Sequence, residues 1–229
     1  AHIAAGLDPE TTMPPGTRLF QFVTLAVCDL TTGVATHHLL VPDLPEHAVM
    51  ALSTHRATLS AWDLMWFSRA VAGIEAADLP LHVRIFPSTL LDVPAAAIRQ
   101  MVPPHLPLER ITLAIDDQYL TGDPALLATR LRPLRDLPVA LCIDASDLGR
   151  ACLECLVLLR PERVNIDGAL VRGFGSSRVR QSALRRFVQV CIALGTQPIA
   201  GGVDDEADRQ ALIDLGVQCG FGAALPSRP

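Results

Sequence analysis

Two short stretches of this sequence contain residue types that could carry out chemistry, and a third lacks a side chain where one is expected. Cys152 and Cys155 have the Cys-x-x-Cys spacing of a metal or redox site. Asp144 closes the apolar run VALCID, and carboxylates are the ligands that hard metal ions prefer. The run Pro198–Ala200 instead ends at Gly201, where an α/β protein usually carries a charged side chain. The sequence thus offers a cysteine pair, a carboxylate and a position whose side chain is missing.

The cysteines are better explained as core residues than as a metal site. No second Cys-x-x-Cys pair, which a zinc site would need, occurs in the chain. Most of the six cysteines lie within apolar runs, which is typical of reduced cysteines in a protein core. We therefore expect them to pack in the core of a cytoplasmic protein. The six are Cys28, Cys142, Cys152, Cys155, Cys191 and Cys219.

The composition indicates a large core and argues against extended polyanions as partners. Of the 229 residues 50% are hydrophobic and 19% are charged, with a formal net charge of −5. Without a basic surplus we expect no binding of a nucleic acid polymer, although a local basic site could still take a small nucleotide. No apolar run reaches the roughly 18–20 residues of a membrane span. Residues 1–17 lack the pattern of a signal peptide and are interpreted as a linker from a longer chain.

Short apolar runs that alternate with helical segments must position these residues. Residues 18–30 and 33–42 flank the turn-like Thr31-Thr32-Gly33 and predict an antiparallel hairpin. Six further runs are almost continuously apolar, as strands buried on both faces are. They are Leu81–Pro87, Ile111–Asp117, Val139–Asp144, Arg163–Asp167, Gln197–Ala200 and Val217–Phe221. Helices are expected at Leu59–Ala77, Ser176–Leu194 and Asp204–Leu215. This order predicts one α/β domain over residues 18–229, a (β/α)8 TIM-like barrel with an antiparallel first strand.

The chain resembles the EAL family, the cyclic-di-GMP phosphodiesterase barrel, from about Phe20 to Pro229. The resemblance rests on six motifs in order, namely DLTTGVATHHLLV, HVRIFPSTLLD, ITLAIDDQYL, CIDASDLGRACLECLVLLRPERVNID, IAGGVDDEADRQALIDLGV and the closing PSRP. It implies a barrel whose active members hold two divalent metal ions, such as Mg²⁺ or Mn²⁺, over the C-terminal mouth. Strand-end carboxylates hold the ions, and a metal-bound water attacks the phosphodiester.

The resemblance also implies that this chain has lost the residues of that chemistry. The family's metal-binding Glu, Asn and Glu on the second, third and fourth strands fall on His37, Arg84 and Ala114. The paired aspartates of the fifth strand fall on Asp144 and Ala145, and the catalytic Lys on Asn165. The later Glu falls on Gly201 and the last Gln on Phe221. Only Asp144 is kept, so we expect no catalytic residues, no metal site and no cofactor.

The positively charged side chain of Arg84 is expected to point to the place where the family binds cations. Because Ala114 between the strands of Arg84 and Asp144 is small, we expect an internal ion pair there, since a buried charge needs a partner. The alternative is that Arg84 extends to solvent. A second alternative is a structural metal held by His37 and Asp144 with Asp116 or Asp117, but His37 and His38 point to opposite faces of their strand and cannot share an ion.

Residues that could still bind the nucleotide are few. Gln21 matches a nucleotide contact of the family, and Arg84 beside Asp144 could offer a phosphate contact. The resemblance implies that the family's phosphate-binding Arg falls on Val41, whose side chain cannot imitate a bidentate donor. We therefore expect cyclic-di-GMP binding to be weak or absent.

The remaining use of such a barrel is contact with another protein. The apolar segment Ala145–Leu159 replaces the loop and helix through which active members dimerise, and it is either an exposed interface or core. The leading hypothesis is a catalytically inactive domain of a bacterial signalling protein that contacts a protein partner, another domain of a longer chain or a second copy. A non-catalytic cyclic-di-GMP receptor is the alternative, and an active phosphodiesterase the third.

Overall fold

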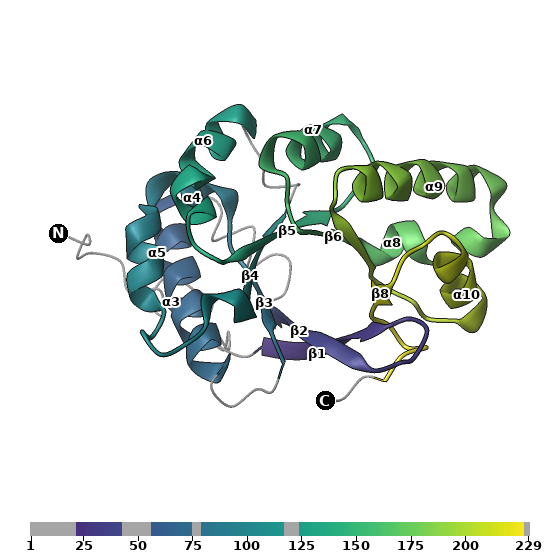
Figure 1. Ribbon diagram of the computed structural model, residues 1–229, viewed down its shortest axis with the longest axis horizontal. Coiled ribbons are helices and arrows are strands. Elements are labelled where there is room, and N and C mark those ends of the chain that lie inside the picture. The colour runs from purple at the N-terminus through teal and green to yellow at the C-terminus, as the bar shows by residue number, and fades with distance from the viewer. Residues whose placement is uncertain (1–21, 43–55, 75–78, 117–123, 227–229) are drawn as a thin grey trace.

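The strands of this protein close into a barrel in chain order (Figure 1). The computed structural model describes residues 22–42, 56–74, 79–116 and 124–226. In that part of the chain eight strands run from β1 to β8, and β8 pairs with β1 to close the ring. The expected barrel and its hairpin start are therefore confirmed. The strands are β1 Phe22–Asp29, β2 Ala35–Pro42, β3 Leu81–Arg84, β4 Ile111–Asp116, β5 Ala140–Ala145, β6 Arg163–Ile166, β7 Gln197–Ala200 and β8 Cys219–Gly220.

The hairpin at the start gives the barrel its antiparallel first strand. β1 pairs antiparallel with both β2 and β8, whereas every later neighbour pair from β2 to β8 is parallel. The Asp29 side chain accepts backbone hydrogen bonds from Thr31 (2.9 Å) and Thr32 (2.7 Å), and Gly33 has a φ of +72°. Glycine suits that backbone conformation, and the aspartate satisfies the turn's amides, so the local sequence determines this hairpin.

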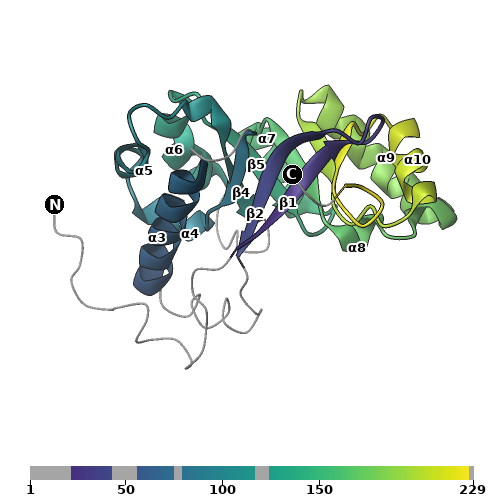
Figure 2. The ribbon, with the colours of Figure 1, turned by 90° about the horizontal axis from the view of Figure 1, so that it is seen from below.

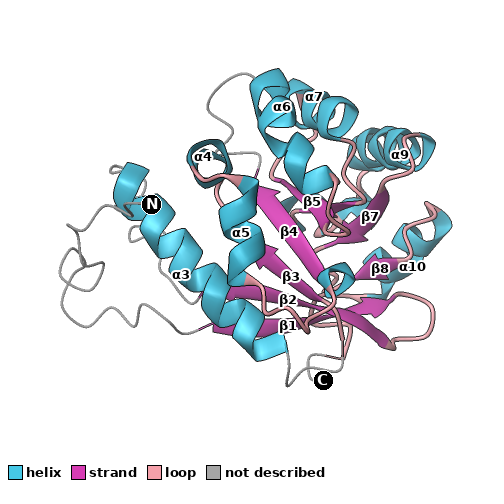
Figure 3. Ribbon diagram, turned by 60° about the vertical axis from the view of Figure 1, so that its left-hand side comes forward, coloured by secondary structure: helices cyan, strands magenta, loops and turns pink. Residues whose placement is uncertain are grey.

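Helices surround the barrel and cover its parallel strands (Figures 1 and 3). In Figure 2 the β1–β2 hairpin lies in front, with α3–α6 on one side of it and α8–α10 on the other. None of the helices in the described ranges is long and apolar enough to cross a membrane. The helices are α3 Arg56–Ile74, α4 Pro87–Asp92, α5 Ala95–Met101, α6 Pro124–Arg135, α7 Arg150–Leu159, α8 Gly168–Val171, α9 Arg178–Ala193 and α10 Glu206–Asp214, with short 3-10 turns η1 Leu108–Arg110 and η3 Phe174–Ser176.

The apolar residues form two cores, one on each side of the strands. The larger core lies between strands and helices and includes Trp62, Trp66 and Phe67 of α3. The smaller core fills the barrel and contains Val27, Leu39, Ile199 and Cys219, with Phe221 packed against it. All six cysteines are buried and free, as expected for core residues. Residues 1–17, expected to be a linker, lie outside the described residues.

Candidate functional site at the C-terminal mouth

The ends of four adjacent strands bring the sequence candidates side by side. In the sheet register Arg84 of β3 lies beside Ala114 of β4, and Asp116 of β4 lies beside Asp144 of β5. Asp144 in turn lies beside Asn165 of β6. Alternate residues of a strand share one face, so these side chains all point into the barrel at the ends of parallel strands. Parallel pairing therefore assembles the site from segments that are far apart in the sequence.

Arg84 and Asp144 form the expected ion pair. Nε and Nη2 of Arg84 donate to Oδ2 of Asp144 at 3.1 and 2.9 Å, while Nδ2 of Asn165 donates to its other oxygen at 3.2 Å. Nη1 of Arg84 also lies 3.7 Å from Oδ2 of Asp116. The Arg84 side chain keeps 33% of its surface exposed, against 8% for Asp144 and 12% for Asp116. Arg84 thus reaches solvent along one side while its charged end is fixed by carboxylates.

Ala114 makes this contact between non-adjacent strands geometrically feasible. Arg84 and Asp144 stand on β3 and β5, with β4 between them. Ala114 is the β4 residue in register with Arg84, it is completely buried, and its methyl group leaves room for the guanidinium to extend toward β5. A longer side chain at Ala114 would project into that same space.

The pocket around this cluster is small and carries more negative than positive charge. Its volume is about 50 Å³. Three aspartates and one arginine line it, so its formal charge is −2 (+1 − 3). One of the aspartates, Asp167, also accepts the Ala169 amide at 2.7 Å and so caps α8. A negatively charged pocket of this size does not favour a phosphate group. The lining residues are Arg84, Asp116, Asp144, Ala145, Ser146, Asn165 and Asp167.

The residues of this mouth do not fit the pair of divalent ions that the family resemblance implies. A hard cation seeks about six oxygen ligands, and a cation already lies between the two buried carboxylates, because Arg84 contacts both. Within the described ranges no group of three or more His, Cys, Asp or Glu side chains is arranged to hold one ion. Ala114 and Ala145 contribute no side-chain oxygen.

Phe221 lies where a side chain on Gly201 would extend. A Cβ atom built on Gly201 would lie 3.0 Å from Cζ of Phe221 and 3.0 Å from the carbonyl oxygen of Ile166. Phe221 itself packs against the apolar core inside the barrel. The bare Gly201 and the phenyl ring of Phe221 are therefore one packing arrangement, because the ring lies in the space that a side chain at Gly201 would need.

His37 does not join the cluster around Arg84. The register pairs Leu39 of β2 with His82 of β3, which places His37 two residues before that level and Arg84 two residues after it. Inside the barrel the His37 ring stacks on His82, with centroids 4.3 Å apart and planes 17° apart. Both histidines are buried. His37 therefore packs deeper in the barrel than the carboxylates, and its equivalence to the family's Glu stays a prediction.

The hydrogen bonds of His37 determine its tautomer. Oγ1 of Thr36 donates to the carbonyl of Val27 at 3.0 Å, so it accepts from Nδ1 of His37 at 2.9 Å. Nε2 of His37 is buried without a hydrogen-bond partner in the structure. Burial, together with the positive charge of Arg163, lowers the pKa of His37 to about 4. The imidazole is thus neutral at ordinary pH, and hydrogen-bonded packing accounts for it.

Two of the candidate residues lie outside the described part of the chain, and the contact of a third with Arg84 was not predicted. Gln21 and Asp117 lie outside the described residues. The sequence suggests only a helper role for Asp116 in a metal site, yet in the structure this residue lies beside the Arg84 guanidinium. The signal was available, because Asp116 follows Ala114 by two residues on an apolar strand and so shares its inward face. His82, two residues before Arg84, was missed although the same alternation places it inside the barrel.

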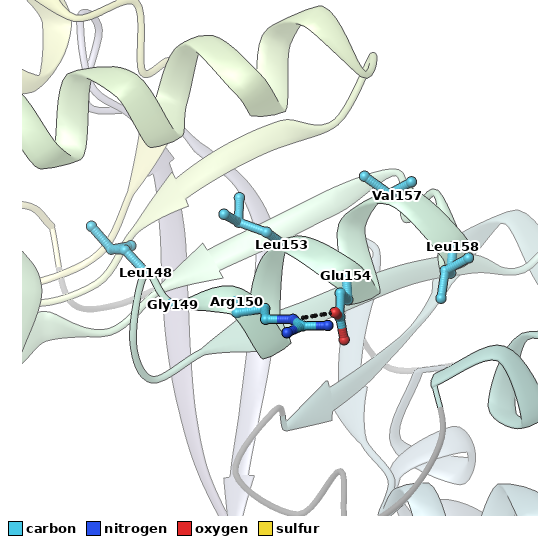
Figure 4. Close-up of a pocket in the computed structure, with 7 residues that line it drawn as sticks. All are labelled: Leu148, Gly149, Arg150, Leu153, Glu154, Val157 and Leu158. Atoms are coloured by element: carbon cyan, nitrogen blue, oxygen red, sulfur yellow. Dashed lines mark hydrogen bonds and ion pairs between the residues drawn. The ribbon is translucent and has the colours of Figure 1, made fainter.

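The segment Ala145–Leu159, expected to be either an exposed interface or core, is buried on one side of α7 and exposed on the other. Cys152, Cys155, Leu156 and Leu159 of α7 are buried, whereas Val157 and Leu158 keep 53% and 46% of their surface exposed. These two residues line an open groove of about 670 Å³ along α7 and the loop before it (Figure 4). Arg150 and Glu154 form an ion pair of 2.6 Å at its edge. The groove lining is completed by Leu148, Gly149 and Leu153.

Comparison with known proteins identifies relatives of this fold. The family model for the EAL domain matches residues 44–229. BlrP1 of Klebsiella pneumoniae, solved at pH 9.0 with manganese and cy-diGMP, superposes with a TM-score of 0.75 at 21% identity, over 94% of this chain and 57% of that chain. This chain therefore spans a little over half the length of BlrP1.

Two isolated domains match over most of their own length. The EAL domain of Xanthomonas citri FimX, solved with c-diGMP, has a TM-score of 0.74 at 17% identity, over 92% of this chain and 88% of that one. The EAL domain of Mycobacterium smegmatis DcpA has a TM-score of 0.67 at 22% identity, over 95% and 93%. At these identities the likeness shows a common fold. No curated protein sequence matches this chain.

Proposed function

Because the chain belongs to the EAL domain family, we propose that it is a degenerate member, a catalytically inactive domain of bacterial cyclic-di-GMP signalling that acts by contact with protein. The proposal has three parts, which are the loss of metal-dependent hydrolysis, the weak or absent binding of cyclic-di-GMP, and a protein contact through the exposed side of α7. We place the domain in the cytoplasm, where that nucleotide is a signal.

The observation that carries the loss of catalysis is the contact between Arg84 and Asp144. Asp144 is the one carboxylate that the resemblance retains from the family's metal site, and both of its oxygens accept hydrogen bonds, from Arg84 and from Asn165. An aspartate engaged in this way has to give up a charged partner before it can bind an ion. Hydrolysis through metal-activated water needs that ion, so we propose that the step does not occur.

The exposed apolar side of α7 supports the protein contact. Val157 and Leu158 lie on one helix with no described element over them, and the groove beside them is lined largely by apolar side chains. Apolar patches of this kind on a folded domain mark interaction surfaces. The occupant we propose is a second copy of the chain, because the resemblance assigns the family's dimer contact to this segment.

Sedimentation velocity tests this contact with an internal control. Replacing Val157 and Leu158 by Glu should convert a dimer into a monomer, because two charges would have to be buried in the interface. Leu126→Glu is the matched control, since Leu126 is 50% exposed but lies on α6. A wild-type chain that stays monomeric at 100 micromolar, or a double variant that still dimerises, would contradict the assignment.

A cyclic-di-GMP receptor is the second candidate, and one observation favours it. The solved domain of FimX, which has the same fold, holds c-diGMP. One face of Arg84 reaches solvent and could contact a phosphate. The charge of −2 in the pocket opposes such binding, so this candidate ranks below protein contact.

A further inference from the structure

We propose that Arg84 is the resident cation of the barrel mouth, and that its guanidinium makes the fold independent of divalent ions. Removal of Arg84 would then expose a cation site formed by Asp116, Asp144 and Asn165, which the native chain fills from within. The inference rests on the proposed function in one respect, since both assign Arg84 to the place where the family binds metal. Its test uses stability alone, so its outcome is separate from that of an activity assay.

The first step is the need for positive charge at this place. Asp116 and Asp144 are in register on adjacent strands, and both side chains are largely buried. Adjacent strands lie only about 4.8 Å apart, so two carboxylates on the same face repel each other unless a cation lies between them. A metal ion, a cationic side chain or a proton on one carboxylate relieves this repulsion, and in this chain a cationic side chain is in place.

The second step is that Arg84 meets this requirement with directed hydrogen bonds. Two of its nitrogens donate to Asp144, and the third lies 3.7 Å from Asp116. Arginine stays protonated at every accessible pH, and its planar fork matches a carboxylate. Asn165 donates to the remaining oxygen of Asp144, so the charge of that carboxylate is fully engaged. A guanidinium in this position supplies the charge of an ion without any dependence on ion concentration.

The third step is that removal of the guanidinium leaves the charges behind. In an Arg84→Gln variant, Asp116 and Asp144 would face each other without the guanidinium between them, and loss of one partner of a buried ion pair is strongly destabilising. The remaining groups are two carboxylates and the Asn165 amide, whose nitrogen faces Asp144 and which would turn to bring its oxygen toward an ion. That oxygen is buried and makes no hydrogen bond in the structure. Oxygen donors of this kind suit Mg²⁺, Mn²⁺ or Ca²⁺.

Thermal unfolding of five chains in a chelator, and then with 5 mM MgCl₂, MnCl₂ or CaCl₂, tests the proposal. Wild type should show the same Tm in all buffers of matched ionic strength. Arg84→Gln should unfold about 5 °C lower in the chelator and regain at least half of that loss with one of the divalent ions. Arg84→Lys, which keeps the charge, should not respond to divalent ions.

Two controls separate charge from packing. Arg84→Gln combined with Asp144→Asn removes both members of the pair, so it should be more stable than Arg84→Gln in the chelator and insensitive to divalent ions. Arg178→Gln, at an exposed position of α9, should change nothing. The proposal is overturned if wild type itself gains stability from a divalent ion, if Arg84→Gln costs no stability, or if Arg84→Gln shows no greater response to the ions than Arg178→Gln.

Discussion

Arg84 donates two hydrogen bonds to one carboxylate oxygen of Asp144 from two strands away. The contact passes over β4 at Ala114, which lies in register with Arg84 and has only a methyl group. The small residue in the middle strand is therefore part of the same arrangement as the arginine and the aspartate. The three positions form a unit, and predictions about one of them involve the others.

Enlargement of Ala114 should break this unit. We expect Ala114→Leu to lower the free energy of unfolding by about 1–3 kcal/mol, because the longer side chain overpacks the site and displaces the guanidinium. Urea denaturation measures the loss. In an Arg84→Gln background the same change should cost clearly less, because the displaced group is already gone. Equal losses in both backgrounds would show that Ala114 does not act through Arg84.

Restoring a side chain at Gly201 should fail while Phe221 is present. We expect Gly201→Ala to destabilise the domain by about 1 kcal/mol or more, since its Cβ would lie 3.0 Å from Phe221 and from a rigid backbone carbonyl. Combined with Phe221→Ala, the additional cost of Gly201→Ala should shrink, and the double-mutant cycle gives the coupling. A cost that stays the same in both backgrounds would assign the strain to the backbone oxygen alone.

The buried carboxyl of Asp63 should make stability fall as pH rises. Asp63 of α3 accepts the Phe86 amide at 2.7 Å, and burial raises the pKa of this carboxyl to about 7, with hydrogen bonds opposing the shift. A raised carboxyl pKa means that the folded state binds more protons than the unfolded state between about pH 4 and 7. Stability relative to Asp63→Asn should therefore decrease through that window, by a few kcal/mol in total, and level off above pH 7.

Urea denaturation from pH 5 to 8 measures this dependence, and Asp136→Asn at an exposed position is the control. A constant difference between wild type and Asp63→Asn across that range would exclude a raised pKa.

His37 should make stability fall as the pH decreases, which is opposite to the pH dependence expected from Asp63. Burial lowers the pKa of its imidazole to about 4, so protons bind the unfolded state preferentially between about pH 6.5 and 4. The stabilising contribution is complete above pH 6.5 and is lost as the pH falls toward 4. The total loss of stability is up to about 3 kcal/mol. His37→Gln should flatten this part of the stability profile without removing it, because burial also lowers the pKa of His82 well below its usual range. A profile identical to wild type would refute the assignment.

The sequence determines the fold more fully than the site, and particular residues show why. The turn at Asp29–Gly33 and the apolar runs are local features, so the hairpin and the barrel strands were predictable from pattern alone. The pair of Arg84 and Asp144 was also predictable, as one of two alternatives, because the family resemblance implies that both residues face the barrel mouth on either side of the small Ala114. The parts that pattern does not reveal are side-chain contacts that depend on strand register, on the path of a loop or on the packing of two helices.

The stack of His37 on His82 is one such contact, since it depends on the register between β2 and β3, which the family resemblance does not specify. The contact of Phe221 with the space above Gly201 depends on the path of the chain after β8. In the sequence Asp63 is not distinguished from other polar residues of a helix. Its carboxyl group is buried because α3 packs against α4.

Isothermal titration of the domain with cyclic-di-GMP, in buffers with and without Mg²⁺ or Mn²⁺, tests the central claim most directly when the linear product is assayed in the same samples. The account predicts no linear product in any buffer and little or no heat of binding. Micromolar or tighter binding without product would replace protein contact by the receptor function, with Arg84 as the first residue to change. Metal-dependent formation of the linear product would contradict the claim that Arg84 has taken the place of the catalytic ions.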